Sequence, residues 1–345
     1  MNKKLIFALV TSLVWLCALG CNKPQPELHV YTWADYIKPE LVQRFEQENR
    51  CKVVIDTFDS NEAMYAKIKA GASGYDIITP SSYMVELMQS QGLLQDLNPK
   101  LLPNLVNIDP EYLKLTTDQS MKHSVPYMLT NTGLAYLQSK VPDFKPTWAA
   151  LERPDLKGRV TMLNDMRESI GAALKFLGFS LNTRDEGELQ QARDVLIRWK
   201  KNLAKFENEQ YKIGIANGEF LLVHGYSGDL LQAQAENEDV AFVVPTQGTS
   251  ISSDDLVIPK TAAQVDLAHR FINFLQEPEV AAENSNFISY VAPNRAAYPL
   301  LDEELKGNPA VFLPDEIKKK CEVIRDLGAD NAKYTKVWDE VKAAE

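Results

Sequence analysis

The sequence predicts an α/β protein with a mostly parallel sheet and helices on both of its faces. Short apolar strands alternate with amphipathic helices along the chain, and this βαβαβ order is typical of parallel sheets. The length of 345 residues is too great for one ordinary domain and suits two. Hydrophobic residues make up 45% of the chain, which is enough for a sizeable core in each domain.

Predicted strands and helices alternate most clearly in the first third of the chain. Short runs rich in β-branched and aromatic residues predict strands at 28–33 (LHVYTW), 52–58 (KVVIDTF) and 75–80 (YDIITP). Apolar residues at helical spacing predict helices at 38–49, 60–71 and 84–92. Pro39 stands in the first turn of the first helix, and Gly71 and Gly92 end the other two.

The middle and the end of the chain repeat this pattern. Strands are predicted at 123–129, 132–137, 159–163, 220–226, 240–245 and 255–259, and the first two of these are candidates to link two domains. The clearest helix is predicted over 183–206, where Thr183 and Glu186 form a capping box. Its apolar stripe comprises Leu189, Ala192, Leu196, Trp199, Leu203 and Phe206. A further helix is predicted over 262–276, and the tail from Pro314 is predicted to be mostly helical.

The N-terminus has the pattern of an export signal. Residues 1–20 combine a basic start (MNKK) with an apolar run that is too short for a confident membrane span. Cys21 follows Gly20 in a stretch, ALGC, that is similar to a bacterial lipobox. We therefore expect a lipoprotein signal peptide over 1–20, lipid on Cys21, and a tether over 21–27; simple signal cleavage is the alternative.

Composition and motifs exclude several classes of function. The formal net charge is -10, and without Lys3 and Lys4 of the signal it becomes -12, so the chain should repel nucleic acid. The sequence has no His or Cys spacing typical of a metal site, no Gly-rich phosphate loop and no GxSxG motif, so we expect no metal and no cofactor. Cys51 and Cys321 could form a disulfide or remain two free thiols.

Acidic and aromatic residues gather where the predicted strands end. In open parallel sheets, ligands bind beyond the carboxyl ends of the strands. The candidates at these positions are Trp33, Asp35 and Tyr36; Ser81, Ser82 and Tyr83; Asp165 and Glu168; Tyr226; Asp254; and Tyr290. Lys and Arg are nearly absent there, apart from Arg167.

At these positions the sequence resembles the periplasmic polyamine-binding proteins of spermidine/putrescine ABC transporters. The matching stretches run in order from about residue 28 to about residue 297: YTWADY, SNEAMYAKIKAG, YDIITPSSYMVELM, SVPYM, NDMRES, DDLVIP and YVAPNRAA. The resemblance implies a type II periplasmic-binding-protein fold, in which two α/β lobes joined by crossover strands close on a ligand. We expect residues 28–130 and 254–297 in lobe 1 and residues 131–253 and 298–345 in lobe 2.

The resemblance also implies roles for individual residues. Its ligand aromatics match Trp33, Tyr36, Tyr83 and Tyr290, its acids match Asp35, Asp165, Glu168 and Asp254, and a serine matches Ser81 or Ser82. The chain departs from the family at three positions: Tyr226 lies in a stretch, VHGYSGD, where the family has a Trp, Ser252 replaces a second Trp, and an apolar residue around Ile324 replaces a Gln. These departures predict a roomier pocket that accepts both putrescine and spermidine.

The expected partners follow from this resemblance. They are a polyamine and an ABC permease in the cytoplasmic membrane, for a periplasmic, lipid-anchored, monomeric protein that is no enzyme. Polyamine chemistry fits the residues independently, because each buried ammonium needs a carboxylate and each methylene run prefers aromatic walls. In this interpretation, WADY supplies one wall and one anchoring charge.

Other interpretations of the same residues remain open. Asp165 and Glu168 could form a capping box at a helix start and touch no ligand. Paired carboxylates between aromatic platforms also describe a glycosidase. Within the solute-binding proteins, iron or a sugar could be the ligand, and a surface lipoprotein that binds a host protein is a further class, which would need an exposed apolar patch.

Overall fold

The structure is a computed structural model that describes residues 25–344. Within this part, nine strands form one sheet in the order β2-β1-β3-β9-β4-β7-β5-β6, and β8 pairs with β4. The strands are β1 (Glu27–Thr32), β2 (Lys52–Thr57), β3 (Ile77–Ile78), β4 (Ser124–Leu137), β5 (Val160–Met162), β6 (Leu203–Phe206), β7 (Leu222–Tyr226), β8 (Val240–Val243) and β9 (Ile251–Val257).

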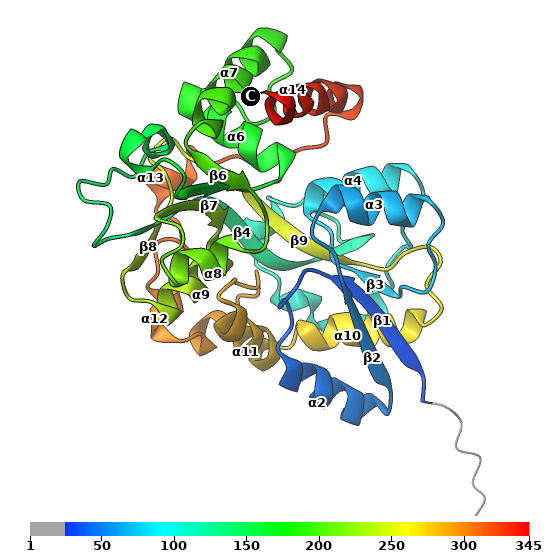
Figure 1. Cartoon of the computed structure of the whole chain (residues 1–345). Helices are drawn as coiled ribbons and strands as arrows, with labels where there is room; N and C mark the ends of the chain where they lie inside the picture. Colours follow the sequence, from blue (N-terminus) through cyan, green and yellow to red (C-terminus); the bar gives the residue numbers. More distant parts are fainter. Residues whose placement is uncertain (1–24, 345) are drawn as a thin grey trace, which may run out of the picture.

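Helices cover the sheet in two groups (Figure 1). β1, β2 and β3 lie with α2, α3, α4 and α10 in one half of the molecule, and β6, β7 and β8 lie with α6, α7, α8 and α9 in the other. The helices are α2 (Pro39–Asn49), α3 (Asn61–Lys69), α4 (Ser82–Ser90), α5 (Pro110–Leu113), α6 (Met166–Leu177), α7 (Glu186–Lys200), α8 (Tyr211–Ala216), α9 (Ser227–Glu236), α10 (Val265–Leu275), α11 (Pro278–Ile288), α12 (Glu303–Lys306), α13 (Asp315–Lys318) and α14 (Asn331–Ala343).

The predicted parallel sheet is present only within each half. β1 is parallel to β2 and β3, and β5 is parallel to β6 and β7. In the middle of the sheet, β9 is antiparallel to β3 and β4, and β4 is antiparallel to β7 and β8. The prediction of a mostly parallel sheet was therefore wrong for the centre, because the strands that connect the halves run against their neighbours.

β4 belongs to both halves of the molecule. From Ser124 to Asn131 it pairs with β9, and from Thr132 to Leu137 it pairs with β7 and β8. The two strands predicted at 123–129 and 132–137 are thus one long strand, with a register shift beside Pro126, which has no N–H to donate. β4 and β9 are the crossover strands, and we call the halves that they join lobe 1 (β1–β3) and lobe 2 (β5–β8).

The predicted helix over 183–206 is shorter than expected. α7 ends at Lys200, and Leu203 and Phe206 form β6, which pairs with β5. Their helical spacing relative to Trp199 was misleading, because pairing in the sheet overrides a local pattern. The cap also differs: Asp185 accepts a hydrogen bond from the Glu188 amide, in place of the predicted box of Thr183 and Glu186.

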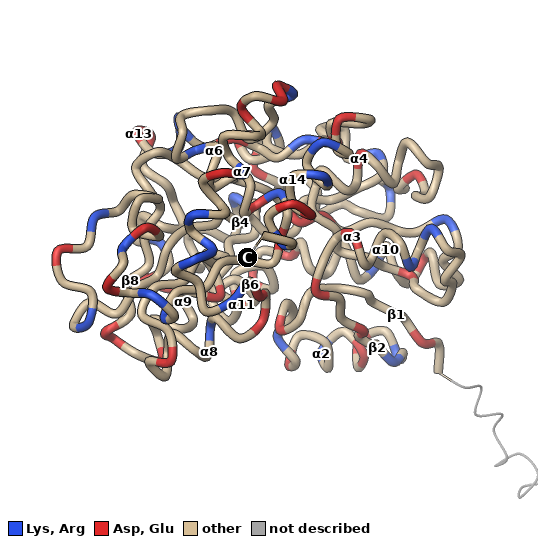
Figure 2. Tube along the Cα trace, turned by 45° about the horizontal axis from the view of Figure 1, so that its top comes forward, with Lys and Arg blue, Asp and Glu red and all other residues tan. Residues whose placement is uncertain are grey.

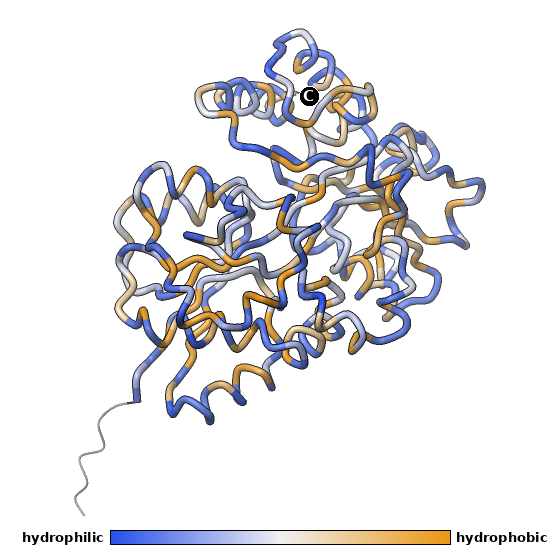
Figure 3. Tube along the Cα trace, turned by 180° about the vertical axis from the view of Figure 1, so that it is seen from behind, coloured by the Kyte–Doolittle hydropathy of each residue, from blue (hydrophilic) through white to orange (hydrophobic). Residues whose placement is uncertain are grey.

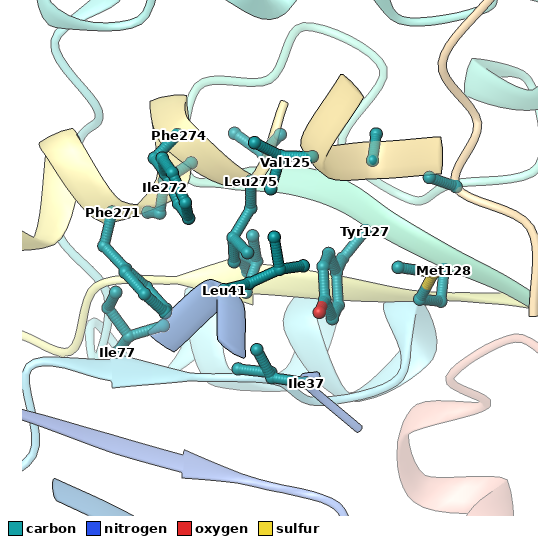
Figure 4. Close-up of a cluster of buried hydrophobic side chains, with 14 of the residues drawn as sticks. Ile37, Leu41, Ile77, Val125, Tyr127, Met128, Phe271, Ile272, Phe274 and Leu275 are labelled. Atoms are coloured by element: carbon teal, nitrogen blue, oxygen red, sulfur yellow. The ribbon is translucent and has the colours of Figure 1, made fainter. Parts of the chain in front are cut away.

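Each lobe has its own hydrophobic core. In lobe 1, Leu41, Ile77, Phe271 and Leu275 lie between the sheet and helices α2 and α10 (Figure 4). The T-shaped contact of Phe45 with Phe271 joins α2 to α10, with ring centroids 4.8 Å apart. Full burial of such side chains stabilises the fold by roughly 1.5–3 kcal/mol each.

The core of lobe 2 lies under α6, α7 and α14. Trp148 and Trp199 are fully buried there, together with Leu196 and with Tyr334 of the C-terminal helix. Residues after 297 divide between the lobes: Leu301 and Leu305 join the core of lobe 1, whereas Ala310 packs against lobe 2. In our proposed division of the chain, the boundary predicted after residue 297 therefore moves to between Leu305 and Ala310.

Charged residues lie on the outside of both lobes, and hydrophobic residues lie mainly inside them. Lys and Arg alternate with Asp and Glu around the outside of both lobes (Figure 2). Hydrophobic positions concentrate on the inner strands and on the inner sides of helices, whereas outer turns are hydrophilic (Figure 3).

No helix among residues 25–344 combines the length and the apolar character needed to cross a bilayer. The predicted signal peptide at 1–20, the lipid on Cys21 and most of the tether at 21–27 lie outside the described residues.

Candidate ligand-binding site

A cleft lies between the lobes, beside the crossover strands β4 and β9. It encloses about 900 Å³ of space not filled by protein atoms, its mouth included. The lining residues come from the ends of strands in both lobes and from the crossover strands: Trp33, Ala34, Tyr36, Phe58, Asp59, Asn61, Ser81, Tyr83, Thr130, Asp165, Glu168, Asn208, Glu209, Tyr226, Asp229, Ser252, Asp254, Tyr290 and Ile324. Every residue predicted for the site is among them except Asp35 and Ser82.

Asp254 is the carboxylate that the crossover strand β9 presents to the cleft. The Tyr36 hydroxyl donates to its Oδ2 at 2.6 Å, and the Ser81 hydroxyl donates to its Oδ1 at 2.7 Å. Its exposed fraction is only 5%. Burial raises the pKa of Asp254 to about 6, although both hydroxyl donors act in the opposite direction.

Asp165 and Glu168 lie on the opposite lobe, at the start of α6. Asp165 is the N-cap, and its Oδ1 accepts hydrogen bonds from the amides of Arg167 and Glu168 at 2.9 and 3.0 Å. Its other oxygen, Oδ2, accepts a hydrogen bond from the Tyr226 hydroxyl at 3.3 Å and lines the cleft. Asp165 therefore caps the helix and also faces the cleft.

Two hydroxyl groups hold the carboxylate of Glu168 in place. Ser250 and Thr132 both donate to its Oε2, at 2.6 and 3.1 Å. Burial raises the pKa of Glu168 to about 8, with a further contribution from the negative charge of Asp165. Burial also raises the pKa of Asp165.

The guanidinium of Arg167 turns away from these acids. It donates to the backbone carbonyls of Arg325 and Leu181 and to the side chain of Asn182, at 2.9–3.3 Å. It also lies over the Tyr334 ring, 4.5 Å from the centroid. The one basic residue that the sequence placed beside the site therefore forms no ion pair with Asp165 or Glu168.

Asp229 is a further acid of the cleft that the prediction did not include. The Tyr211 hydroxyl donates to its Oδ2, and burial raises its pKa. It lies in the first turn of α9, three residues after Tyr226 at the end of β7. The signal that could have found it was this position beyond a strand end.

The walls of the cleft are aromatic. Tyr36 meets Tyr290 edge to face, with ring centroids 5.5 Å apart, and Trp33 packs on Phe58 at 4.3 Å. Burial and the neighbouring carboxylates raise the pKa of Tyr36 and Tyr290 well above their usual range, so both hydroxyls stay neutral. Gly228 lets Tyr290 approach, because a Cβ at this position would lie 2.0 Å from the tyrosine ring.

Asp35 and Ser82, which were also predicted for the site, do not line the cleft. Asp35 lies in a turn with a left-handed backbone (φ 53°), its side chain is 78% exposed, and its Oδ2 lies 3.7 Å from Lys212 Nζ. The Ser82 hydroxyl, in the first turn of α4, accepts a hydrogen bond from the Thr117 amide at 2.8 Å inside lobe 1. Asp254, which was also predicted for the site, is the carboxylate that the neighbouring Tyr36 contacts.

The His, Cys, Asp and Glu side chains of residues 25–344 form no candidate metal centre. No group of three or more His, Cys, Asp or Glu side chains in this part of the chain is arranged to hold a metal ion. Cys51 and Cys321 are free thiols, the first buried and the second partly buried.

Comparisons with known proteins agree with this architecture. A family described as bacterial extracellular solute-binding protein matches residues 40–313. The putrescine-binding periplasmic protein of Escherichia coli is 33% identical, over 99% of this chain and 99% of its own.

Two solved structures share the fold over most of this chain. A putative spermidine/putrescine ABC transporter protein from Listeria monocytogenes is 36% identical, with a TM-score of 0.88, and the match covers 93% of this chain and 100% of that one. A lipoprotein of Treponema pallidum is 34% identical, with a TM-score of 0.83, over 91% of this chain and 99% of its own. The two-lobed arrangement of the sheet is therefore the one found in solute-binding proteins.

Proposed function

The chain belongs to the bacterial extracellular solute-binding proteins, and we propose that its solute is a polyamine such as putrescine or spermidine. The relatives above support this ligand, because the E. coli protein is named for putrescine and the Listeria protein for spermidine and putrescine. We further propose that the lobes close on the polyamine and that the closed form delivers it to an ABC permease.

One observation carries the choice of ligand. The buried or partly buried carboxylates of Asp165, Glu168, Asp229 and Asp254 share one cleft, and none of them forms an ion pair within residues 25–344. Buried charges without partners are costly, so a site of this kind is stabilised by a ligand that brings the opposite charge. An ammonium group supplies that charge and several hydrogen-bond donors.

The walls of the cleft match the rest of a polyamine. Trp33, Tyr36 and Tyr290 offer apolar faces for the methylene groups and aromatic faces for the ammonium groups. An ammonium over such a face gains about 0.5–2 kcal/mol in addition to its pairing with a carboxylate. We propose that Trp33, Tyr36, Ser81, Tyr83, Asp165, Glu168, Tyr226, Asp229, Asp254 and Tyr290 contact the ligand.

The glycosidase interpretation uses the same carboxylates. A hydrolase of this kind needs two carboxyls whose pKa values are pushed apart, so that one is an acid and the other stays ionised. Here burial raises the pKa of Asp165, Glu168, Asp229 and Asp254, to about 8 for Glu168 and to about 6 for Asp254, so product analysis with oligosaccharides has to distinguish the two functions. A bound polyamine would lower all of these pKa values, because its ammonium groups favour the charged carboxylates. The relatives named above are binding proteins, which favours the binding function.

The alternative ligands, iron and sugars, suit the cleft less well. A ferric site needs Tyr, His and carboxylate groups that converge, and none of the four His residues lines the cleft. A neutral sugar would leave the carboxylates without a compensating charge. We therefore propose a binding protein without catalytic activity, located in the periplasm, as the printed name of the E. coli relative indicates for that protein. Lipid anchoring through Cys21 and a monomeric state remain part of this proposal.

Calorimetric titration of residues 22–345 with putrescine, spermidine, maltose and ferric citrate tests the proposal. We expect saturable binding of both polyamines and no binding of the other two ligands. Binding of maltose or ferric citrate without binding of polyamine would refute the proposed ligand. Product analysis after incubation with oligosaccharides tests the glycosidase interpretation separately.

A further inference from the structure

A second, smaller cavity lies beside the crossover strands. It shares two lining residues, Thr130 and Tyr290, with the cleft. It encloses about 440 Å³ of space not filled by protein atoms, its mouth included. Its other lining residues come from α5, α9, the crossover strands and the segments around residues 289 and 311–318. We call this space the second cavity.

The charge of the second cavity is opposite to that of the cleft. The cleft is lined by several acids and by no Lys or Arg, whereas the second cavity is lined by Lys318 and by no Asp or Glu. The ammonium of Lys318 lies over the ring of Tyr112, which also lines the cavity, 5.0 Å from the ring centroid. Within residues 25–344, Lys318 forms no ion pair. The second cavity therefore disfavours a polyamine and suits a small anion.

Two buried polar atoms of the lining have no hydrogen-bond partner in the part of the chain that the structure describes. They are Oδ1 of Asn131 and Oγ1 of Thr130, in residues that are 7% and 9% exposed. The side-chain nitrogen of Asn131 already donates to the Ala310 carbonyl at 2.9 Å, so its oxygen remains as an acceptor. Because a buried acceptor without a partner is costly, an occupant of the cavity that brings a hydroxyl group is favoured.

Most of the remaining lining is apolar. It consists of Leu129, Ile251, Val291, Val311 and Leu313. These walls favour a short alkyl chain, because its contact with them removes apolar surface from water. The second cavity thus combines one cation, one free acceptor and apolar walls in a small space.

We propose that the second cavity is a binding site for a short hydroxycarboxylate such as 3-hydroxybutyrate. Lys318 pairs with the carboxylate, Asn131 accepts a hydrogen bond from the hydroxyl group, and the apolar walls contact the alkyl chain. The inference goes beyond the proposed function and does not depend on it, because this site takes an anion and has none of the acids of the cleft. Since Thr130 and Tyr290 line both spaces, the bound anion shares a wall with the ligand of the cleft.

Calorimetric titration of residues 22–345 with three related molecules tests the proposed chemistry. We expect 3-hydroxybutyrate to bind at millimolar concentrations or below. Butyrate lacks the hydroxyl group and should bind roughly tenfold more weakly, because Asn131 Oδ1 stays without a partner. Butane-1,3-diol lacks the charge and should also bind at least tenfold more weakly. If 3-hydroxybutyrate does not bind, the second cavity holds only water, and the proposal is wrong. It is also wrong if butyrate or the diol binds as tightly as 3-hydroxybutyrate.

Three variants locate the bound carboxylate. Lys318→Met removes the cation and should weaken 3-hydroxybutyrate at least tenfold. The matched control is Lys319→Met, which removes the next lysine, an exposed one, and should leave binding unchanged. Melting temperatures near that of the parent would show that both variants fold. Asp254→Asn alters the cleft and should also bind 3-hydroxybutyrate like the parent. Equal losses in both lysine variants, or a loss in Asp254→Asn, would place the carboxylate elsewhere and overturn the proposal.

Discussion

Replacing Asp254 with Asn removes the central charge of the cleft and keeps its shape. The amide has the size of the carboxylate, and the hydroxyls of Tyr36 and Ser81, which now donate at 2.6 and 2.7 Å, can bond either end of it. Aromatic walls and backbone should therefore stay in place. The substitution changes only the group with which an ammonium of the ligand can pair, from a carboxylate to a neutral amide.

The loss of binding can be worked out from these contacts. An ammonium left without a buried carboxylate costs about 2–5 kcal/mol of binding. The neighbouring hydroxyl oxygens and the carboxylates of Glu168 and Asp229 still offer partial compensation, which favours the lower half of this range. We expect a loss of about 3 kcal/mol, or a dissociation constant for putrescine roughly a hundredfold higher.

The same substitution should stabilise the ligand-free protein. The pKa of Asp254 is raised from 3.8 to about 6, so its contribution to stability is present at low pH and is lost as the pH rises through 6. At pH 7.5 that loss amounts to about 3 kcal/mol, reduced by about 1 kcal/mol for the poorer hydrogen bonds of the amide. Asp254→Asn should therefore melt at a higher temperature than the parent without ligand.

Asp255→Asn is the matched control. Asp255 is the next residue of β9 and is fully buried, but its carboxylate points into lobe 1, where Ser253 and Ser124 donate to it at 2.7 and 3.2 Å. Burial raises its pKa to about 7, so this substitution removes a comparable charge outside the cleft. Calorimetric titration at pH 7.5 should show near-parental putrescine binding for Asp255→Asn. The reasoning is refuted if Asp254→Asn binds within threefold of the parent, or if both variants lose binding equally.

The remaining predictions concern pH, shape and ligand choice. Putrescine affinity should fall by roughly tenfold or more from pH 8 to pH 6, because Glu168, with a pKa of about 8, and Asp254, with a pKa of about 6, must lose protons to pair with ammonium groups; titration in buffers of different ionisation enthalpy should show proton release, and a flat profile would contradict this. The melting temperature of the ligand-free protein should rise as the pH falls from 8 to 6, since Glu168 and Asp255 bind protons more tightly in the fold than in the unfolded chain; calorimetry checks this, and a fall over that range would count against it. Small-angle scattering should show a smaller radius of gyration with putrescine than without, and an unchanged radius despite confirmed binding would exclude lobe closure. Competition against labelled spermidine should give dissociation constants for putrescine and spermidine within about tenfold, as the smaller Ser252 and Ile324 of the cleft suggest; a preference above about a hundredfold would show that other residues restore selectivity.

Much of the site follows from one sequence rule, that ligands lie beyond the ends of parallel strands. Trp33, Tyr83, Asp165 and Tyr226 were predicted in this way and line the cleft. Asp35 shows the limit of the rule, because its direction depends on a left-handed turn, which Asp favours more than most residues but does not by itself predict. Ser81 and Ser82 could not be separated, since adjacent residues at a helix start point in different directions.

Residues that depend on packing between distant elements were harder to predict. Asp229 and Tyr211 come together only because α8 lies against α9, and their helical positions alone do not indicate a shared environment. Ile324 enters the cleft from a C-terminal segment that has little regular structure of its own. The same dependence on packing explains an error in the predicted fold. The residues of β6 have the spacing of a helix end, and only their pairing with β5 shows that they form a strand.

The pairing of β3 with β9 governs how the chain can fold during synthesis. Ile78 lies opposite Val257, and β9 is also the strand that separates β3 from β4. The core of lobe 1 likewise needs Phe271 and Leu275 of α10. A ribosome must therefore complete nearly all of lobe 2 before lobe 1 can close, and such long-range pairing makes folding slow. A truncated chain that stops before β9 would expose the edge of β3 and an unfilled core, and it should aggregate or be degraded instead of forming a stable half-molecule.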